Sequence, residues 1–271
     1  FTITKDLYSA QVALLNTCSV RENANNKVLN RVHQLKQDVG QSLIVGVLGC
    51  MATNFKTQLL ENKRLNIDLI AGPDSYKALP ALIEDALDES VSDKPFDVTL
   101  SEFETYDSIA PTRQEGANAW VSIMRGCNNF CTFCVVPYTR GSEFSRPAIT
   151  VLNEARRLVA SGTRELTLLG QNVNAYHGES GSGGVWSLCR LVRALAEIDW
   201  LERIRYTTSH PLDMDDELIA AHGDVPQLMP YLHLPIQSGS NHILRKMNRR
   251  HTSDIYMAVI DKLRTVRPDI A

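Results

Sequence analysis

The sequence lacks the features that would direct it into or across a membrane. It holds no run of about eighteen apolar residues, the length that a transmembrane helix needs. Residues 1 to 7 contain no basic segment followed by an apolar core, so no signal peptide is visible. We therefore expect a cytoplasmic protein with no membrane partner. The chain also starts without Met, directly before a strand-like segment, and we expect its native N-terminus to be missing.

An excess of either charge is also lacking. With 28 Lys and Arg against 31 Asp and Glu, the formal net charge is −3, which gives no electrostatic argument for nucleic-acid binding. One local basic group lies near the C-terminal end: Arg245, Lys246, Arg249 and Arg250. It fits a solvated helix end and a contact for phosphates equally well. The composition, 44% hydrophobic and 22% charged over 271 residues, suits two modest globular domains.

The context of the cysteines favours metal binding or catalysis. In the absence of a secretory signal, a disulfide framework is not expected. The chain has six cysteines: Cys18, Cys50, Cys127, Cys131, Cys134 and Cys189.

The first 88 residues alternate short apolar runs with helical patterns. Predicted strands cover 12–15, 43–48 and 67–71. Apolar residues at helical spacing from Val28 to Val39, and again from Leu79 to Ala86, predict amphipathic helices between and after them. This alternation is typical of βαβ units, so we expect a domain over 1–88 with a Rossmann-like parallel sheet.

A second α/β series follows a segment of different character. Residues 89–115 are acidic, contain Pro95 and Pro111 and show no sustained period, which predicts a linker with at most one short strand. Over 116–271 the predicted strands are 120–124, 165–169, 204–208 and 231–234. Helical patterns lie at 152–159, 188–195 and 255–266.

Three cysteines stand close together after the first strand of this second series. In Cys127-Asn-Asn-Phe-Cys131-Thr-Phe-Cys134, three thiolates can bind three irons of a cubane cluster and leave the fourth iron open. That iron can chelate S-adenosylmethionine, and the cluster can reduce the sulfonium to release a 5′-deoxyadenosyl radical. The alternative is a structural zinc site, which usually needs a fourth Cys or His; none follows Cys134 at a usual spacing.

The triplet resembles that of the radical S-adenosylmethionine superfamily. Phe133 stands at the usual aromatic position, which the resemblance places near the adenine of the cofactor. The implied fold of the second part is a partial TIM-type (β/α) barrel of about six strands. Because only four strand candidates are present, we expect this barrel to be incomplete.

Cys18 and Cys50 each follow the carboxyl end of a predicted strand. In an open parallel sheet those ends share one crevice, so both thiols can belong to one site; two buried, inert cysteines are the alternative. Asn16-Thr17-Cys18-Ser19-Val20-Arg21-Glu22 and Gly49-Cys50-Met51-Ala52 resemble the N-terminal domain of methylthiotransferases. The resemblance implies an auxiliary 4Fe-4S cluster. The family's third ligand lies in an upstream Gly-Cys-Gln-Met-Asn-like segment that this sequence lacks, and Cys189, inside a helical pattern, is expected to be a buried structural thiol.

Further segments extend the resemblance along nearly the whole chain. These are 135–141 (Val-Val-Pro-Tyr-Thr-Arg-Gly), 145–147 (Ser-Arg-Pro), 168–174 (Leu-Leu-Gly-Gln-Asn-Val-Asn), 209–211 (Ser-His-Pro) and 233–240 (His-Leu-Pro-Ile-Gln-Ser-Gly-Ser). The 168–174 segment is similar to that of methylthiotransferases acting on isopentenyladenosine in tRNA. Cys127, Gln171, Ser209 and Gln237 all fall at strand ends, which form one catalytic face in a β/α barrel.

Individual roles are hypotheses that the resemblance and chemistry suggest together. Gln171, Ser209 and Gln237 can hydrogen-bond the cofactor, while Asn172 and Asn174 can face the adenine substrate. Two further residues, Tyr138 and Arg140, can stack on or pair with RNA. His210 is a candidate catalytic base or a residue that orients another. For each of these polar groups a satisfied turn residue is the alternative.

The implied activity is methylthiolation of N(6)-isopentenyladenosine at position thirty-seven of tRNA. It would use two 4Fe-4S clusters, two molecules of S-adenosylmethionine and an electron donor such as flavodoxin or ferredoxin, in a monomer that binds the tRNA anticodon loop. The alternatives are a methylthiotransferase for threonylcarbamoyladenosine or a ribosomal-protein aspartate, and a non-catalytic iron–sulfur or zinc RNA-binding module. No segment matches the family's C-terminal TRAM domain, so we expect it to be absent.

Overall fold

A computed structural model describes residues 1–19, 21–101, 116–181 and 183–271. The chain forms two compact units. The first comprises Phe1–Glu104 and Cys134–Gly141, and the second comprises Thr105–Phe133 and Ser142–Ala271. Both units are α/β. Among the described residues, no helix combines the length and the apolar character that a membrane crossing would require.

A four-stranded parallel sheet forms the first unit, as the βαβ pattern predicts. Its strands, in spatial order, are β1 (Val12–Thr17), β2 (Ile44–Gly49), β3 (Leu69–Ala71) and β4 (Phe96–Asp97). Each neighbouring pair is parallel. β4 is the one short strand that the sequence allowed within 89–115, and it pairs with β3 of this sheet. Residues 102–115 of the predicted linker lie outside the described residues.

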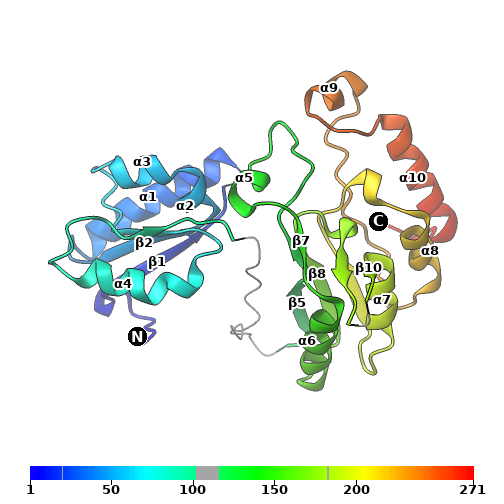
Figure 1. The fold of residues 1–271 in the computed structure, drawn as a ribbon, viewed down its shortest axis with the longest axis horizontal. Helices are drawn as coiled ribbons and strands as arrows, with labels where there is room; N and C mark the ends of the chain where they lie inside the picture. The colour runs from blue at the N-terminus through cyan, green and yellow to red at the C-terminus, as the bar shows by residue number, and fades with distance from the viewer. Residues whose placement is uncertain (20, 102–115, 182) are drawn as a thin grey trace. The chain divides into compact units, whose positions relative to one another are not determined.

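Helices cover both faces of this sheet (Figure 1). They are α1 (Glu22–Asp38), α2 (Cys50–Asn54), α3 (Lys56–Glu61) and α4 (Leu79–Leu87), with short 3-10 turns η1 (Leu7–Ser9) and η2 (Tyr76–Ala78). On one face α1 and α3 bury Val32 and Leu59 against Val47; on the other, α4 buries Ile83 near Leu48. Successive strand residues point to opposite faces, so a sheet covered on both sides needs the continuous apolar runs that the sequence shows.

The second unit has a three-stranded parallel sheet. The strands are β5 (Asn118–Ser122), β8 (Glu165–Leu169) and β11 (Arg203–Tyr206), with β8 in the centre. Two antiparallel pairs accompany it: β6 (Met124–Arg125) with β7 (Phe144–Ser145), and β9 (His177–Glu179) with β10 (Val185–Ser187). The helices are α6 (Ala148–Ala160), α7 (Leu188–Ala196), α8 (Asp216–Asp224), α9 (Asn241–Lys246) and α10 (Ser253–Val266), with turns η3 (Val173–Ala175) and η4 (Pro211–Asp213). Cys189 is buried in α7, as expected.

The fourth predicted strand, 231–234, is not formed. This segment runs as irregular backbone, in which the Leu232 N–H donates to Ala271 O at 2.8 Å. Pro230 and Pro235 stand on either side of it and have no N–H to give to a ladder. The apolar run is still partly buried, with Leu234 at 7% exposure, which is why its pattern imitates a strand.

Candidate functional site

The loop 126–133 of the second unit, which contains Cys127 and Cys131 and is called the cysteine loop below, begins directly after β6. Its first turn is set by Gly126, whose φ of 71° is in the left-handed region that glycine adopts without strain. The Gly126 N–H donates to Gln171 Oε1 at 2.7 Å, and Gln171 follows the carboxyl end of β8. The sequence suggested a cofactor contact for Gln171. In the structure its amide oxygen fixes the backbone next to Cys127, so the side chain is already committed to shaping the cysteine loop.

A distant segment, Lys246 to Arg249, holds the other end of this loop. Asn248 Nδ2 donates to Phe130 O at 2.9 Å, and the Thr132 N–H donates to Met247 O at 3.1 Å. Both Phe130 and Asn248 have positive φ values, 47° and 55°, so each has a left-handed backbone conformation at this contact. Sequence reasoning missed this segment, since the contact spans more than a hundred residues. The only signal it offered was the local basic group.

Two of the three cysteine sulfurs in the second unit accept N–H donors. Arg249 Nη1 lies 3.6 Å from Cys131 Sγ, and Asn129 Nδ2 lies 3.5 Å from Cys127 Sγ. Arg249 is 9% exposed, and its Nε finds no partner among the described residues. A guanidinium in this position can donate to the sulfur of a cysteine that binds iron.

His210 and Asn174 form a buried pair behind the strand ends. Asn174 Oδ1 accepts the His210 N–H and Asn174 Nδ2 donates to His210 O, both at 2.8 Å. Both polar atoms of the Asn174 side chain are therefore paired within this loop, as in the alternative of a satisfied turn residue, and a contact with the substrate stays a prediction. Burial, followed by the charges of Arg249 and His251, lowers the pKa of His210 to about 4. Its Nδ1 accepts the Leu212 N–H at 3.3 Å, so the neutral ring orients a turn.

Two buried polar atoms near the strand ends have no partner within the described part of the chain. They are the Ser209 hydroxyl, after β11, and Asn172 Oδ1, after β8. Asn172 Nδ2 itself donates to Asp213 Oδ2 at 2.8 Å. Unpartnered buried groups are costly, so these two are available to a ligand. Gln237, in contrast, is exposed with φ 71°, and Phe133 is 54% exposed.

In the first unit Cys18 and Cys50 each directly follow the carboxyl end of one of two neighbouring parallel strands, and a site that uses both thiols stays a prediction. Thr17 of β1 is in register with Gly49 of β2, and one cysteine follows each of them. The approach is close: a Cβ on Gly49 would lie 2.6 Å from Thr17 O, and Gly49 has φ 88°. Only glycine fits here. Cys18 is exposed, and Cys50 is 7% exposed.

Arg140 joins this second pair of thiols. Its helix, α5 (Val136–Arg140), belongs to the first unit, and Arg140 Nε donates to Cys50 Sγ at 3.1 Å. Tyr76, which donates to Asn16 Oδ1 at 3.3 Å, has its pKa raised by burial, while the Arg140 charge opposes the rise. The sequence suggested an RNA contact for Arg140, which stays a prediction; in the structure its guanidinium donates to a sulfur. Tyr138 in the same helix is 68% exposed.

The donor chemistry suits iron–sulfur clusters, although the thiols are not drawn together. Within the described residues, no three His, Cys, Asp or Glu side chains are gathered closely enough to hold a metal ion. All six cysteines are described and none is in a disulfide. The N–H groups near three of the sulfurs, and the unpartnered Ser209 hydroxyl, are groups of the kind that stabilise cluster thiolates and bind a cofactor.

Comparison with known families agrees with this chemistry. The model described as "Radical SAM superfamily" matches residues 121–269, more than half of the chain, and the chain belongs to that superfamily. A second model, described as "Uncharacterized protein family UPF0004", matches residues 1–72. The two matches divide the chain between the N-terminal parallel-sheet unit and the radical S-adenosylmethionine unit.

Curated relatives narrow the comparison. The chain is 48% identical to "tRNA-2-methylthio-N(6)-dimethylallyladenosine synthase" of Zymomonas mobilis subsp. mobilis, over 97% of this chain and 58% of the relative. Its identity to the protein of the same name from Paracoccus denitrificans is also 48%, over 100% of this chain and 60% of the relative. The chain therefore spans somewhat more than half the length of these relatives.

Solved structures show the same fold at low sequence identity. A radical S-adenosylmethionine methyltransferase, TsrM, from Kitasatospora setae aligns with TM-score 0.64 and 12% identity, over 94% of this chain and 56% of that one. The cobalamin-dependent radical enzyme OxsB aligns with TM-score 0.61 and 13% identity, over 96% of this chain and 40% of that one. These matches place the fold among radical S-adenosylmethionine enzymes.

Proposed function

We propose that this chain is the catalytic part of a methylthiotransferase that converts N(6)-isopentenyladenosine at position thirty-seven of tRNA to its 2-methylthio derivative. The observation that carries the proposal is the pairing of two cysteine sets, Cys127–Cys131–Cys134 and Cys18–Cys50, in a chain 48% identical to relatives of that name. The domains proposed for it are a methylthiotransferase domain, including β4, and a radical S-adenosylmethionine domain.

Cys127, Cys131 and Cys134 would hold one 4Fe-4S cluster, and Cys18 and Cys50 would contribute to a second. When bound, these groups and S-adenosylmethionine supply a radical that removes hydrogen from C2 of the adenine and the methylthio group that replaces it. The protein's own part is positional: Gln171 and Asn248 fix the ends of the cysteine loop, and Arg249 donates to Cys131. Fixing both reactants in place is worth several kcal/mol of the barrier.

Ser209 and Asn172 are the residues that fit cofactor and substrate best, because each has a buried polar atom left to pair. Phe133, exposed in the cysteine loop, can lie against the adenine of the cofactor. Tyr138 offers an exposed ring to an unstacked base. Gln237, whose side chain is exposed, is proposed as a further contact of the cofactor.

The partners proposed are a tRNA anticodon loop that carries isopentenyladenosine and an electron donor such as flavodoxin or ferredoxin. The setting proposed is the cytoplasm, and the proposed active species is a monomer.

Mass spectrometry of tRNA nucleosides tests the proposal directly. In cells that lack the gene, the 2-methylthio group should disappear while isopentenyladenosine is retained. Loss of a methylthio group from threonylcarbamoyladenosine, or from a ribosomal-protein aspartate, would identify the other substrates instead.

The class of site is tested on the full-length protein. After anaerobic reconstitution we expect iron and a cluster absorption band, and Cys131→Ala should abolish formation of 5′-deoxyadenosine. Stoichiometric zinc without iron, or 5′-deoxyadenosine formed at the normal rate by Cys131→Ala, would contradict radical chemistry.

A further inference from the structure

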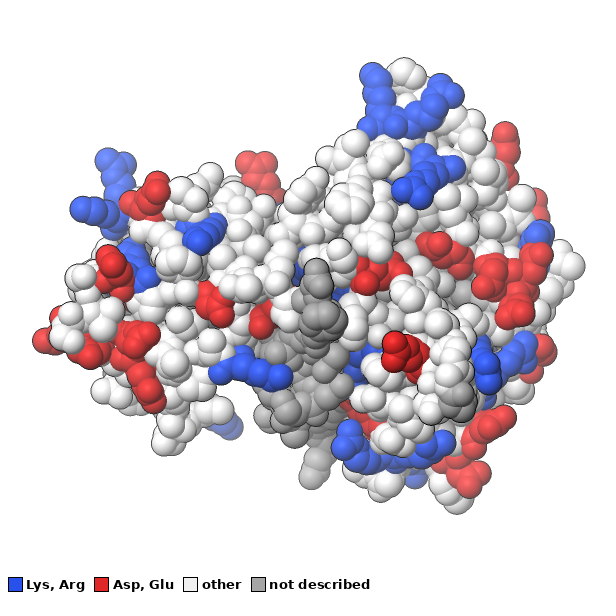
Figure 2. Space-filling model, in the orientation of Figure 1, with Lys and Arg blue, Asp and Glu red and all other residues white. Residues whose placement is uncertain are grey.

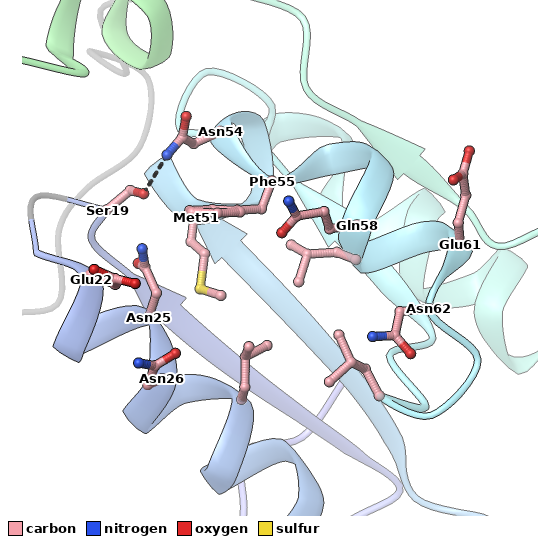
Figure 3. A pocket seen from close by; sticks show the side chains of 13 residues that line it. Ser19, Glu22, Asn25, Asn26, Met51, Asn54, Phe55, Gln58, Glu61 and Asn62 are labelled. Atoms are coloured by element: carbon pink, nitrogen blue, oxygen red, sulfur yellow. Dashed lines mark hydrogen bonds between the residues drawn. The ribbon is translucent and has the colours of Figure 1, made fainter.

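The first unit contains an open pocket of about 800 Å³ on the face of the sheet covered by α1, α2 and α3 (Figure 3). That volume lies within the range of small-molecule sites. Ser19, directly after Cys18, lines one end of the pocket, and its hydroxyl accepts a hydrogen bond from Asn54 Nδ2 at 2.8 Å. None of the roles proposed above for the clusters or the cofactor uses the pocket.

The floor of the pocket is apolar and its rim carries amides. Met51, which is 1% exposed, and Phe55, which is half-buried, line the pocket from the α2–α3 segment, across from α1 (Figure 3). Around them stand the exposed amides of Asn26, Asn54 and Gln58. An apolar floor under a ring of amides suits a flat, polar-edged group, which can stack on the floor and pair with the rim.

Asn25 gives the pocket an unmet hydrogen-bonding demand. This residue is 7% exposed, lines the pocket from α1, and its Oδ1 has no partner among the described residues. A buried carbonyl oxygen without a donor is costly to the folded state. The Glu22 carboxylate lies beside Asn25 in Figure 3, so this part of the lining offers acceptors side by side. The matching ligand must bring N–H donors.

The charges of the lining residues restrict the class of ligand further. The lining includes the carboxylates of Glu22 and Glu61, and no Lys, Arg or His is among its residues. A phosphate or carboxylate inside the pocket would meet repulsion without a counter-charge. A neutral ring with an exocyclic amine meets an acceptor instead. Nucleobases have this combination, and Asn and Gln amides read their edges.

We propose that this pocket is a subsite for an unstacked, amine-bearing nucleobase of the RNA substrate, separate from the adenosine that is modified. The inference rests on the proposed tRNA substrate. Cytosine fits because its N4 amine can donate to Asn25 Oδ1 or Glu22, while uracil presents a carbonyl at the same position and is rejected. Sugar and phosphate stay outside the acidic lining.

Cytidine and uridine are a matched pair of probes, since they differ at this edge and neither resembles S-adenosylmethionine. Binding to the full-length protein is measured by saturation-transfer difference NMR titration. We expect cytidine to bind about tenfold more tightly than uridine, and Asn25→Leu to abolish that preference. The control Asn30→Leu changes an exposed residue of the same helix that does not line the pocket. Gln58→Ala, at the exposed rim, weakens cytidine binding without touching the core.

Equal binding of the two nucleosides, or a preference that survives in both Asn25→Leu and Gln58→Ala, overturns the subsite. Cys131→Ala keeps the subsite apart from the proposed reaction, because cytidine preference should persist in it. If gene loss leaves tRNA methylthiolation intact but cytidine binding depends on Asn25, the proposed methylthiotransferase function fails, while the pocket stands as a nucleobase-binding site. If methylthiolation is lost and cytidine does not bind, the subsite alone fails.

Discussion

Cys50 is the residue at which separate parts of the first unit meet. It begins α2, follows the strand end at Gly49, and accepts Arg140 Nε at 3.1 Å. Hydrogen bonds and positive charge at a cluster sulfur stabilise the reduced, more negative state. Arg140 therefore has a role at Cys50 that its place in the sequence did not suggest.

Replacing Arg140 with Met should lower the reduction potential of the auxiliary cluster while leaving its iron content in place, because a donor and a charge are lost but no ligand is. The measurement is a redox titration followed by EPR, in a protein whose Cys127, Cys131 and Cys134 are all Ala. Arg31→Met, on the exposed surface of α1, is the matched control. An unchanged potential in Arg140→Met would show that the contact has no electronic effect.

His222 makes stability depend on pH. It is fully buried, its Nε2 lies 2.6 Å from the Tyr206 hydroxyl, and burial, followed by the Arg267 charge, lowers its pKa from 6.5 to about 4. Between those values the unfolded chain binds a proton that the folded chain does not, so the free energy of unfolding falls as pH drops from 6.5 towards 4. The full effect is up to about 3 kcal/mol.

Urea unfolding between pH 4.5 and 7 measures this dependence. In His222→Gln the loss of stability on acidification should shrink by up to about 3 kcal/mol. His242→Gln, a change at an exposed position, should keep the wild-type slope. A His222→Gln slope equal to that of the wild type would mean that other groups carry the pH dependence.

At the level of secondary-structure elements, the strands that could be predicted are those with continuous apolar runs between turn residues. Val12–Thr17, Ile44–Gly49 and Glu165–Leu169 match their predictions within about two residues at the ends. The 231–234 segment was wrong, since periodicity does not register that flanking prolines remove donors. The position of β4 within its acidic segment could not be predicted, because two residues are too few to show a period.

The candidate site, too, could be predicted from the sequence only in part. Cysteine positions follow from local sequence, because strand ends in a parallel sheet converge. The segment Lys246 to Arg249 could not be foreseen, since its bonds to the cysteine loop depend on tertiary structure and on Asn248 adopting φ 55°. Local patterns contain no information about either.

Asn248 provides the test of that segment. Asn248→Ala loses the bond to Phe130 O, about 1 kcal/mol, and puts in the left-handed region a residue that tolerates it less well than Asn, for about 1 kcal/mol more. Asn248→Gly loses only the bond. Melting temperature and iron bound after reconstitution should therefore fall in the order wild type, Gly, Ala. Equal losses for Gly and Ala would show that the backbone conformation of residue 248 contributes nothing.

At the scale of the whole molecule, a net charge of −3 has to be reconciled with a proposed RNA partner. The answer suggested by Figure 2 is local concentration, because Lys and Arg atoms gather over α9 in the second unit. Arg245, Lys246 and Arg250 are exposed there, while the buried Arg249 donates to Cys131. The basic group of the sequence thus consists of three surface cations and one buried residue that contacts the cysteine loop.

The surface cations should contribute to tRNA affinity by releasing counterions. Replacing Arg245, Lys246 and Arg250 with Ala should weaken binding of an anticodon stem-loop RNA, and make the slope of log affinity against log salt shallower by up to about 2. Filter binding at several salt concentrations measures both. The control removes three other exposed cations of the second unit, Arg156, Arg157 and Arg264. If that control flattens the slope equally, RNA affinity follows net charge and the α9 group has no special place in it.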